Sequence, residues 1–266
     1  MKEKQLSGSI KYLIIYSIIS SILLLFLLFN DFSSNLNNFD EGSTQVSIDS
    51  LKVRFIAAER VDVVEADGKL GISLSNSDLS PLPRFDGKEL QGANDRSSPN
   101  IIFFDGKGDE VGGINFFNDE QNENAIRHLA FDGFKQDEVV TLSHFVKNGK
   151  TNTGLYIYDR PHINIMEALD EMGILATDDS KTLSEKVKDF KKEQPERYNE
   201  IWDSQRRIAV QTNDSKQSEI VLADGNGKSR LRLSVSKSGT ASIEFLDENG
   251  AVIHRIDPNN NQMPKP

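Results

Sequence analysis

The stretch that decides the fold is SEIVLADGNGKSRLRLSV, residues 218–235, in which Asp224-Gly225-Asn226-Gly227 separates two apolar runs. After the turn, Leu231, Leu233 and Val235 alternate with polar residues, a period of two that is typical of a strand with one buried face. Asp at the first turn position and Gly at the fourth suit a type I turn followed by a bulge at positive φ. This stretch therefore predicts a β-hairpin.

The same turn pattern recurs along the chain as an acidic residue, two spacers and a Gly. Complete copies begin at Glu65, Asp105, Asp224 and Asp247, and copies without the final Gly begin at Asp132 and Asp159. Asp105, Asp132 and Asp159 follow one another at intervals of 27 residues, and Asp247 lies 23 residues after Asp224. Such regular spacing predicts about six consecutive hairpins.

These hairpins indicate an all-β domain over residues 53–257. The run Ile101–Phe104 is apolar on both faces, which predicts a strand in the interior of the sheet. Repeats of this length fit three ways of closing the hairpins, namely a barrel, a sandwich or a short solenoid. The pattern does not choose among the three.

A helical insert is predicted within the β domain at about 163–206. Two capping boxes mark helix starts, one pairing Asn164 with Glu167 and one pairing Thr182 with Glu185. Gly173 is placed to end the first helix, and Pro195 suits the first turn of a third. Three aromatic side chains lie in the second half of the insert, at Phe190, Tyr198 and Trp202. We expect them either to cap the β core or to form a partner or dimer surface, because an apolar helical face must be buried.

A membrane anchor is predicted at Tyr12–Phe29, which has 18 residues and no charge. A bilayer core about 30 Å thick needs roughly 17–25 such residues as a helix. Lys2, Lys4 and Lys11 precede this run and acidic residues follow it, so the positive-inside rule places the N-terminus in the cytoplasm. The alternative is a cleaved signal peptide, although the Ala-x-Ala cleavage pattern is missing.

The predicted organisation follows from this anchor. Residues 1–30 form a cytoplasmic tip and single transmembrane helix, 31–52 a Ser- and Asn-rich tether, and 258–266 a disordered tail. The main domain at 53–257 is then periplasmic or extracellular, at a bacterial plasma membrane. The chain contains no Cys and has a net charge of −10, so disulfides and thiolate sites are excluded and nucleic acid is a poor partner.

Motifs that could carry chemistry are incomplete. Gly225–Ser229 ends like a phosphate-binding loop but lacks the preceding Gly, and it lies in a hairpin turn. Asp105, Asp109 and Glu110 could hold a surface cation, although the calcium loop is not complete. The four histidines, which are candidate metal ligands only if they meet in space, are His128, His144, His162 and His254.

Two further motifs contain neighbouring charges, and the common catalytic motifs are missing. Asp159-Arg160-Pro161-His162 reads either as an anion-binding loop or as an Asp–Arg pair across a turn, and the pair is favoured. Glu59-Arg60 reads in the same way, as cross-strand charges. With 41 acidic residues, some pair of carboxylates will lie close together by chance, so such a pair does not by itself indicate a glycosidase. The sequence has neither the Gly-x-Ser-x-Gly elbow nor a cysteine nucleophile. We assign no catalytic, cofactor-binding or metal residue and no cofactor.

Several blocks together resemble a widespread family of bacterial membrane-associated exported proteins of unknown function. The blocks are residues 55–70, 101–114, 128–134 and 154–161, followed by the two C-terminal Asp-x-x-Gly hairpins. The resemblance covers roughly 53–257. The family's usual Asn-Asp-Glu-Gly turn is Asp105-Gly106-Lys107-Gly108 here. The resemblance implies the extent of the exported domain and brings no activity, cofactor or catalytic residue.

The expected function is a non-catalytic binding or structural module of the cell envelope, anchored by a single helix. The alternative is an envelope hydrolase that uses a carboxylate pair on saccharide or peptidoglycan. A third possibility is a stabilising subunit of a larger envelope complex. The oligomeric state is left open.

Overall fold

The computed structural model describes residues 50–93, 96 and 98–258. The predicted anchor at Tyr12–Phe29 lies outside these residues, as do most of the predicted tether and nearly all of the predicted tail. Among the described residues, no helix is both long enough and apolar enough to cross a membrane. The description below concerns residues 57–258, which belong to one compact unit.

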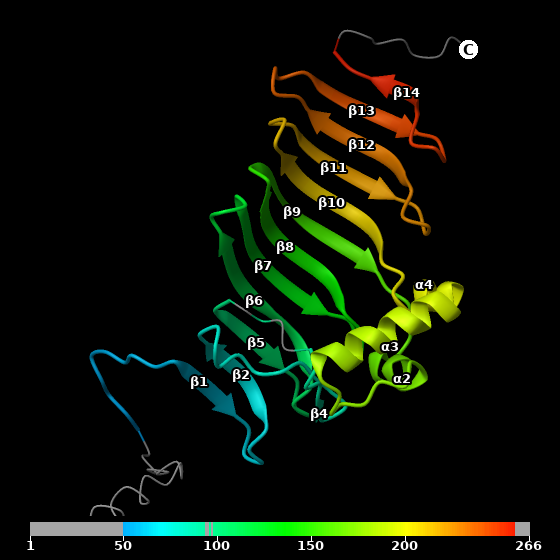
Figure 1. The fold of residues 1–266 in the computed structure, drawn as a ribbon. Helices are drawn as coiled ribbons and strands as arrows, with labels where there is room; N and C mark the ends of the chain where they lie inside the picture. Colours follow the sequence, from blue (N-terminus) through cyan, green and yellow to red (C-terminus); the bar gives the residue numbers. More distant parts are fainter. Residues whose placement is uncertain (1–49, 94–95, 97, 259–266) are drawn as a thin grey trace, which may run out of the picture. The chain divides into compact units, whose positions relative to one another are not determined.

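Twelve strands form one antiparallel sheet in which each strand pairs with the next along the chain (Figure 1). Its strands in order are β1 (Arg60–Val64), β2 (Leu70–Ser75), β5 (Asn100–Phe104), β6 (Glu110–Asp119), β7 (Asn124–Asp132), β8 (Glu138–Lys147), β9 (Lys150–Asp159), β10 (Gln205–Asn213), β11 (Ser218–Ala223), β12 (Ser229–Val235), β13 (Ala241–Leu246) and β14 (Val252–Ile256). Two short strands, β3 (Arg84–Phe85) and β4 (Lys88–Glu89), pair separately in the loop between β2 and β5. The predicted hairpin repeat is confirmed as a continuous meander.

The hairpin turns have the predicted chemistry. Gly108 has φ +82° and donates its N–H to the Asp105 carbonyl at 2.8 Å. The Asp105 carboxylate accepts the backbone N–H groups of Lys107 at 2.8 Å and Asp109 at 3.0 Å. The turns that begin at Asp224 and Asp247 repeat all of these contacts. An Asp side chain thus satisfies the N–H groups that the turn leaves unpaired, and Gly adopts the left-handed conformation at low cost.

The two shorter copies behave differently. At Asp132 the turn moves one residue on, so that Gly133 and Asp137 close it through a backbone hydrogen bond of 3.1 Å. At Asp159 the prediction of a simple hairpin is wrong, because the helical insert follows before β10 returns to pair with β9. The sequence pattern also missed four turns at the other ends of the strands, at residues 120–123, 148–149, 214–217 and 236–240.

The closure of the sheet differs from all three predicted arrangements. Within the described residues, β1 and β14 lie at the two ends of the strand order and do not pair with each other. A barrel would require that pairing, a sandwich would require a second large sheet, and a solenoid would coil the repeats. The chain instead forms an open sheet in which every connection except the insert and the β2–β5 loop is a tight turn to the adjacent strand. The run Ile101–Phe104 lies in β5, an interior strand as predicted.

The insert contains the three predicted helices, α2 (Ile165–Glu171), α3 (Ser180–Glu193) and α4 (Pro195–Ile201). The Asn164 side chain caps α2 by accepting the Met166 N–H at 2.9 Å, and Gly173 at φ +69° follows its end. Pro195 begins α4 as predicted. The second capping box is wrong, because Asp179 caps α3 by accepting the Thr182 N–H at 2.7 Å. Asp179 has the extended backbone that a cap requires, and Thr182 lies inside the helix.

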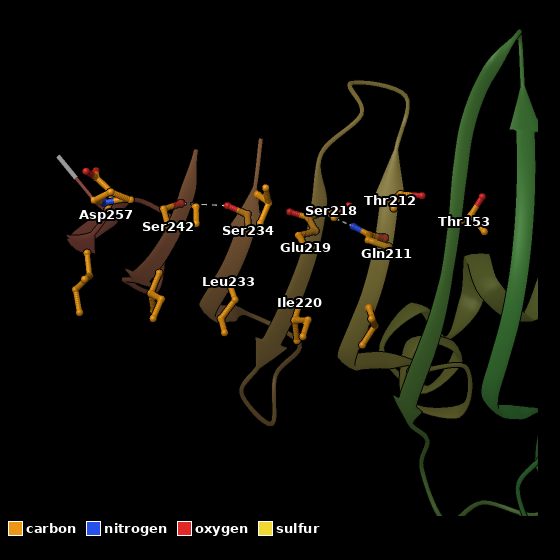
Figure 2. A pocket seen from close by; sticks show the side chains of 16 residues that line it. Thr153, Gln211, Thr212, Ser218, Glu219, Ile220, Leu233, Ser234, Ser242 and Asp257 are labelled. Carbon is orange, nitrogen blue, oxygen red and sulfur yellow. Dashed lines mark hydrogen bonds between the residues drawn. The ribbon is translucent and has the colours of Figure 1, made fainter. Parts of the chain in front are cut away.

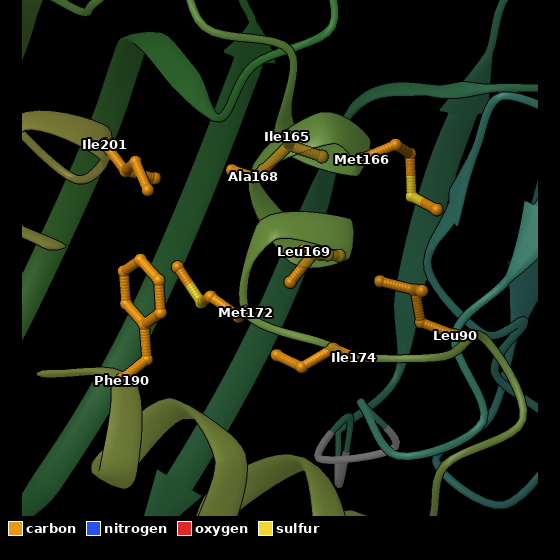
Figure 3. Packing of buried hydrophobic residues seen from close by; sticks show 9 residues of the cluster. All are labelled: Leu90, Ile165, Met166, Ala168, Leu169, Met172, Ile174, Phe190 and Ile201. Carbon is orange, nitrogen blue, oxygen red and sulfur yellow. The ribbon is translucent and has the colours of Figure 1, made fainter. Parts of the chain in front are cut away.

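The largest cluster of buried apolar side chains lies in this insert (Figure 3). Its members are Leu90, Ile165, Met166, Ala168, Leu169, Met172, Ile174, Phe190 and Ile201. Phe190 is buried, and Tyr198 and Trp202 pack against the cluster with ring centroids 6.5 Å apart. These aromatics therefore build the insert's own core, together with the β2–β5 loop that supplies Leu90.

Candidate functional site

An unbroken row of aliphatic side chains crosses the entire sheet. Each of the 12 strands contributes one residue, and every residue lies directly opposite the next in the strand register. This aliphatic row consists of Val61, Leu74, Ile101, Ile114, Leu129, Leu142, Leu155, Val210, Ile220, Leu233, Ile243 and Ile256. Directly opposed β-branched and Leu side chains stabilise neighbouring strands.

A second row runs two residues away on the same face. It consists of Val63, Ile72, Phe103, Gly112, Phe131, Val140, Ile157, Ile208, Leu222, Leu231, Phe245 and His254. We call the face that carries both rows the apolar face. Across these described positions neither row contains Asp, Glu, Lys or Arg, so the net charge of the chain lies elsewhere.

No part of the chain that the structure describes covers the apolar face. Nine of the twelve aliphatic-row side chains are 36–54% exposed, with Leu142 at the upper limit. The alternating pattern predicts that this side of each strand is buried, and that prediction is wrong. Leu233, at 36% exposure, illustrates the correction, whereas Ser73 and Thr141 on the opposite face are at most 2% exposed. Since monomeric soluble proteins rarely leave more than a few hundred Å² of contiguous apolar surface in water, the face is a candidate interaction surface.

The opposite face carries a row that is polar apart from one Gly. This polar row consists of Arg60, Ser75, Asn100, Asn115, His128, Ser143, Gly154, Gln211, Glu219, Ser234 and Ser242. Many of its side chains bond to one another, as in Ser75 with Asn100 at 3.1 Å and Ser234 with Ser242 at 3.1 Å. Its polar groups are thus largely occupied within the sheet.

A broad hollow lies on the apolar face over the C-terminal strands. Its volume is about 810 Å³, and its apolar lining comes mainly from Val210, Ile220, Leu233, Val235, Ile243 and Ile256. Figure 2 shows Ile220 and Leu233 on one side of their strands, while Gln211 and Glu219 are joined by a hydrogen bond on the other. This size matches typical ligand pockets of 300–1,000 Å³, but the hollow offers few polar groups to orient a small molecule. Apolar contact is therefore what the surface can provide.

A half-buried carboxyl group, that of Asp132, lies on the opposite side of the sheet at the end of β7. Burial is the main cause that raises the pKa of Asp132, to about 7, and the nearby charges of Glu110, Asp137 and Glu138 raise it further. Arg96 opposes them. Burial removes water from the ionised carboxyl group, and the neighbouring negative charges repel it, so both effects favour the protonated form of Asp132.

The acids around Asp132 each have a basic side chain as a partner. Glu110 pairs with Arg96. The Glu138 carboxylate accepts a hydrogen bond from His128 Nε2 at 2.7 Å, and Asp137 pairs with Arg160 at 3.0 Å. The adjoining cavity holds only about 90 Å³, which is well below a typical ligand pocket. Asp132 therefore has a role in stability that the structure explains, and the cavity that its side chain lines is too small for a saccharide.

The predicted phosphate and cation motifs are occupied by turn contacts. Gly225–Ser229 lies between β11 and β12 as a hairpin turn and the beginning of β12. Asp105 caps its own turn, and Asp109 accepts the Gly87 N–H at 2.7 Å. Glu110 pairs with Arg96, so the three acids point their oxygens at different partners.

The four histidines do not form one site. His128 lies in the polar row and bonds to Ser143 at 2.7 Å. His144 is on the apolar side of β8 and bonds to Thr153 at 2.7 Å, while His254 stacks on Phe245 in β14. Among the described residues, no group of three or more His, Asp or Glu side chains could hold a metal ion.

The two charged motifs pair with partners that the sequence does not indicate. Asp159 pairs with Arg207 at 2.9 Å, and Arg160 pairs with Asp137, so the predicted Asp159–Arg160 pair is wrong. Arg60 pairs with Asp62 in its own strand at 2.8 Å, which replaces the predicted cross-strand pair. In both motifs the charges are therefore engaged in ion pairs within the sheet domain.

No protein-family model matches the chain, and a search of curated proteins finds no match either. The candidate site therefore stands on its own geometry.

Proposed function

We propose that this chain is a single-pass membrane-anchored protein of the bacterial cell envelope, whose exported β-sheet domain is a non-catalytic binding module. The apolar face is its binding surface. The anchor at Tyr12–Phe29 and the positively charged residues before it support the location. The resemblance of residues 53–257 to exported bacterial membrane proteins supports it further.

The observation that carries the proposal is the aliphatic row. A single large sheet needs a hydrophobic face packed against something, because an apolar side chain gains about 1.5–3 kcal/mol only when it leaves water. Here the helical insert has its own core, and the row keeps 36–54% of nine side chains exposed. A binding partner supplies the missing cover.

The absence of cysteine allows a direct experiment on the full-length protein in its native membrane. Leu142→Cys places one thiol at a 54% exposed position near the middle of the aliphatic row. Ser215→Cys places one in the exposed turn between β10 and β11. The two variants are treated with a membrane-impermeant maleimide on intact cells, and the rates of labelling are compared.

If a partner covers the apolar face, Leu142→Cys is labelled at least tenfold more slowly than Ser215→Cys, and urea abolishes the difference. Equal rates in native membranes would refute the binding surface. Slow labelling of both variants, relieved for both when the membrane is made permeable, would refute export instead. The anchor has its own test, because release of full-length protein by a carbonate wash contradicts it.

The alternative function is a hydrolase that uses a carboxylate pair. The observation in its favour is Asp132, because a carboxyl group with a pKa of about 7 is suited to general acid catalysis. The 90 Å³ cavity beside it and the ion pairs of its neighbours argue against the alternative. Loss of peptidoglycan or saccharide cleavage in Asp132→Asn, with the fold retained, would support the hydrolase and count against the binding module.

A further inference from the structure

We propose that the apolar face binds a second copy of this chain, with the two sheets stacked face to face as a symmetric dimer. The inference rests on the proposed function, since it names the partner of the same surface. Three occupants of such a face can be compared from their size, shape and charge: the chain's own N-terminal apolar segment, a lipid bilayer and another sheet of the same kind.

The area of the apolar face is the first criterion. Twelve strands about 4.8 Å apart span about 55 Å, and the two rows with their flanks extend about 15 Å along the strands, which gives on the order of 800 Å². A standard protein interface buries about 800 Å² on each partner. One copy of the face is therefore large enough for a stable dimer.

The chain's own apolar segment is too small to cover this face. Tyr12–Phe29 has 18 residues, and as a helix it would be about 27 Å long and about 10 Å wide. It would cover roughly 270 Å², a third of the face. If it spans the bilayer, as the sequence predicts, it is also not free to fold back.

A bilayer fits the face less well in shape and in charge. Large sheets are twisted, so a flat membrane meets only part of such a surface, whereas two twisted sheets pack face to face with their strand directions within about 30° of each other. The chain also has a net charge of −10, which opposes approach to anionic lipid.

A second copy satisfies the remaining condition, which concerns charge at the contact. Neither row contains Asp, Glu, Lys or Arg among the described strands, so two copies meet mainly through Val, Ile, Leu and Phe, with His254 at one end of the second row. The ion pairs on the other face, such as Arg232 with Glu244 at 3.1 Å, stay outside the interface. An isologous contact of this kind closes on itself as a two-fold dimer.

The register of the sheet places Leu142 and Leu155 in its middle. They are opposite each other on β8 and β9, the sixth and seventh strands of the order. In a dimer that buries the whole face, this centre lies beside its own copy. Stacked sheets lie about 10 Å apart, which exceeds the Cα separation of about 7 Å that a disulfide tolerates, so a short bis-maleimide is the appropriate crosslinker.

The test uses the full-length chain in native membranes. Single variants Leu142→Cys, Leu155→Cys and Ser215→Cys are treated with the bis-maleimide, and the mass of the wild type is measured after gentle detergent extraction. We expect a dimeric mass, and a covalent dimer from Leu142→Cys or Leu155→Cys, which lie at the centre of the face, but not from Ser215→Cys. Leu142→Asp should shift the mass to that of a monomer with its circular dichroism unchanged, while Ser215→Asp stays dimeric.

The outcomes separate this inference from the proposed function. A monomeric wild type, or crosslinking from Ser215→Cys as strong as from the two apolar positions, overturns the dimer. Slow maleimide labelling of Leu142→Cys without any crosslinked dimer leaves the binding surface intact and assigns it to lipid or to a different protein. Fast labelling of Leu142→Cys overturns both.

Discussion

Asp132 makes the stability of this protein depend on pH in a direction opposite to that of most carboxylates. Its pKa rises from the ordinary value of 3.8 to about 7, first through burial and then through Glu110, Asp137 and Glu138. A group with a raised pKa contributes stability that is fully present below its unfolded pKa and is lost as pH rises through the folded value. Wild-type stability should therefore fall between about pH 4 and pH 8.

The size of this effect follows from the pKa itself. Each pKa unit corresponds to about 1.4 kcal/mol, so ionisation of Asp132 in the folded state costs on the order of a few kcal/mol, at most about 4. Asp132→Asn keeps the shape of the side chain and removes the titration. We therefore expect the variant to lose most of the decline in stability between pH 4 and pH 8 and to exceed the wild type at pH 8.

The assay is urea unfolding of the full-length protein at several pH values. The single Trp202 packs against the insert cluster and gives a fluorescence signal for that part of the fold, while circular dichroism follows the sheet. Asp119→Asn is the control, because a hydrogen bond from Asn122 lowers the Asp119 pKa and its titration lies below pH 4. A decline in Asp132→Asn as steep as in the wild type would refute this explanation.

Three further substitutions test the fold. Gly250→Ala should cost about 1–2 kcal/mol because Gly250 has φ +81°, whereas Gly225→Ala, with open space and no positive φ, should be close to neutral by thermal unfolding. Ile201→Ala should cost about 2–5 kcal/mol because Ile201 is 1% exposed in the insert core, while Leu175→Ala at 60% exposure should cost far less in urea. Asp179→Ala should cost about 1 kcal/mol through loss of the α3 cap, and an unchanged unfolding midpoint would restore the predicted cap at Thr182.

The turns could be predicted from the sequence because their chemistry is local. Asp105 contacts N–H groups two and four residues away, and Gly108 lies three residues away, so all the groups that form the turn lie within five consecutive residues. The same holds for the Asn164 cap of α2. The α3 cap was missed because two capping patterns overlap, and the backbone conformation of Asp179 decided between them.

The candidate site could not be predicted because it depends on long-range register. The alternation at Leu231, Leu233 and Val235 indicates one apolar side of one strand, and it suggests burial. Only the aligned register shows that Val61 and Ile256, at opposite ends of the sheet, belong to the same row and that nothing described covers it. A shift of one residue in any turn would break the row, so the row is a property of the whole meander.

The Asp132 cluster shows the same limit. Its charges come from β6, β7, β8 and the loop before β5, and they meet only when these segments are paired. The ion pairs of Arg160 and Asp159 likewise join residues 23 and 48 positions apart along the chain. Asp159 and Arg160 are neighbours in the sequence, which suggested that they pair. They do not pair because consecutive residues at the end of a strand have side chains on opposite faces.

The rate at which a membrane-impermeant maleimide labels Leu142→Cys in native membranes tests the central claim most directly. The claim is that a partner covers the apolar face, which the described residues leave exposed. It predicts labelling at least tenfold slower than for Ser215→Cys on intact cells, with the difference abolished in urea. Labelling of Leu142→Cys as fast as Ser215→Cys before denaturation would contradict it.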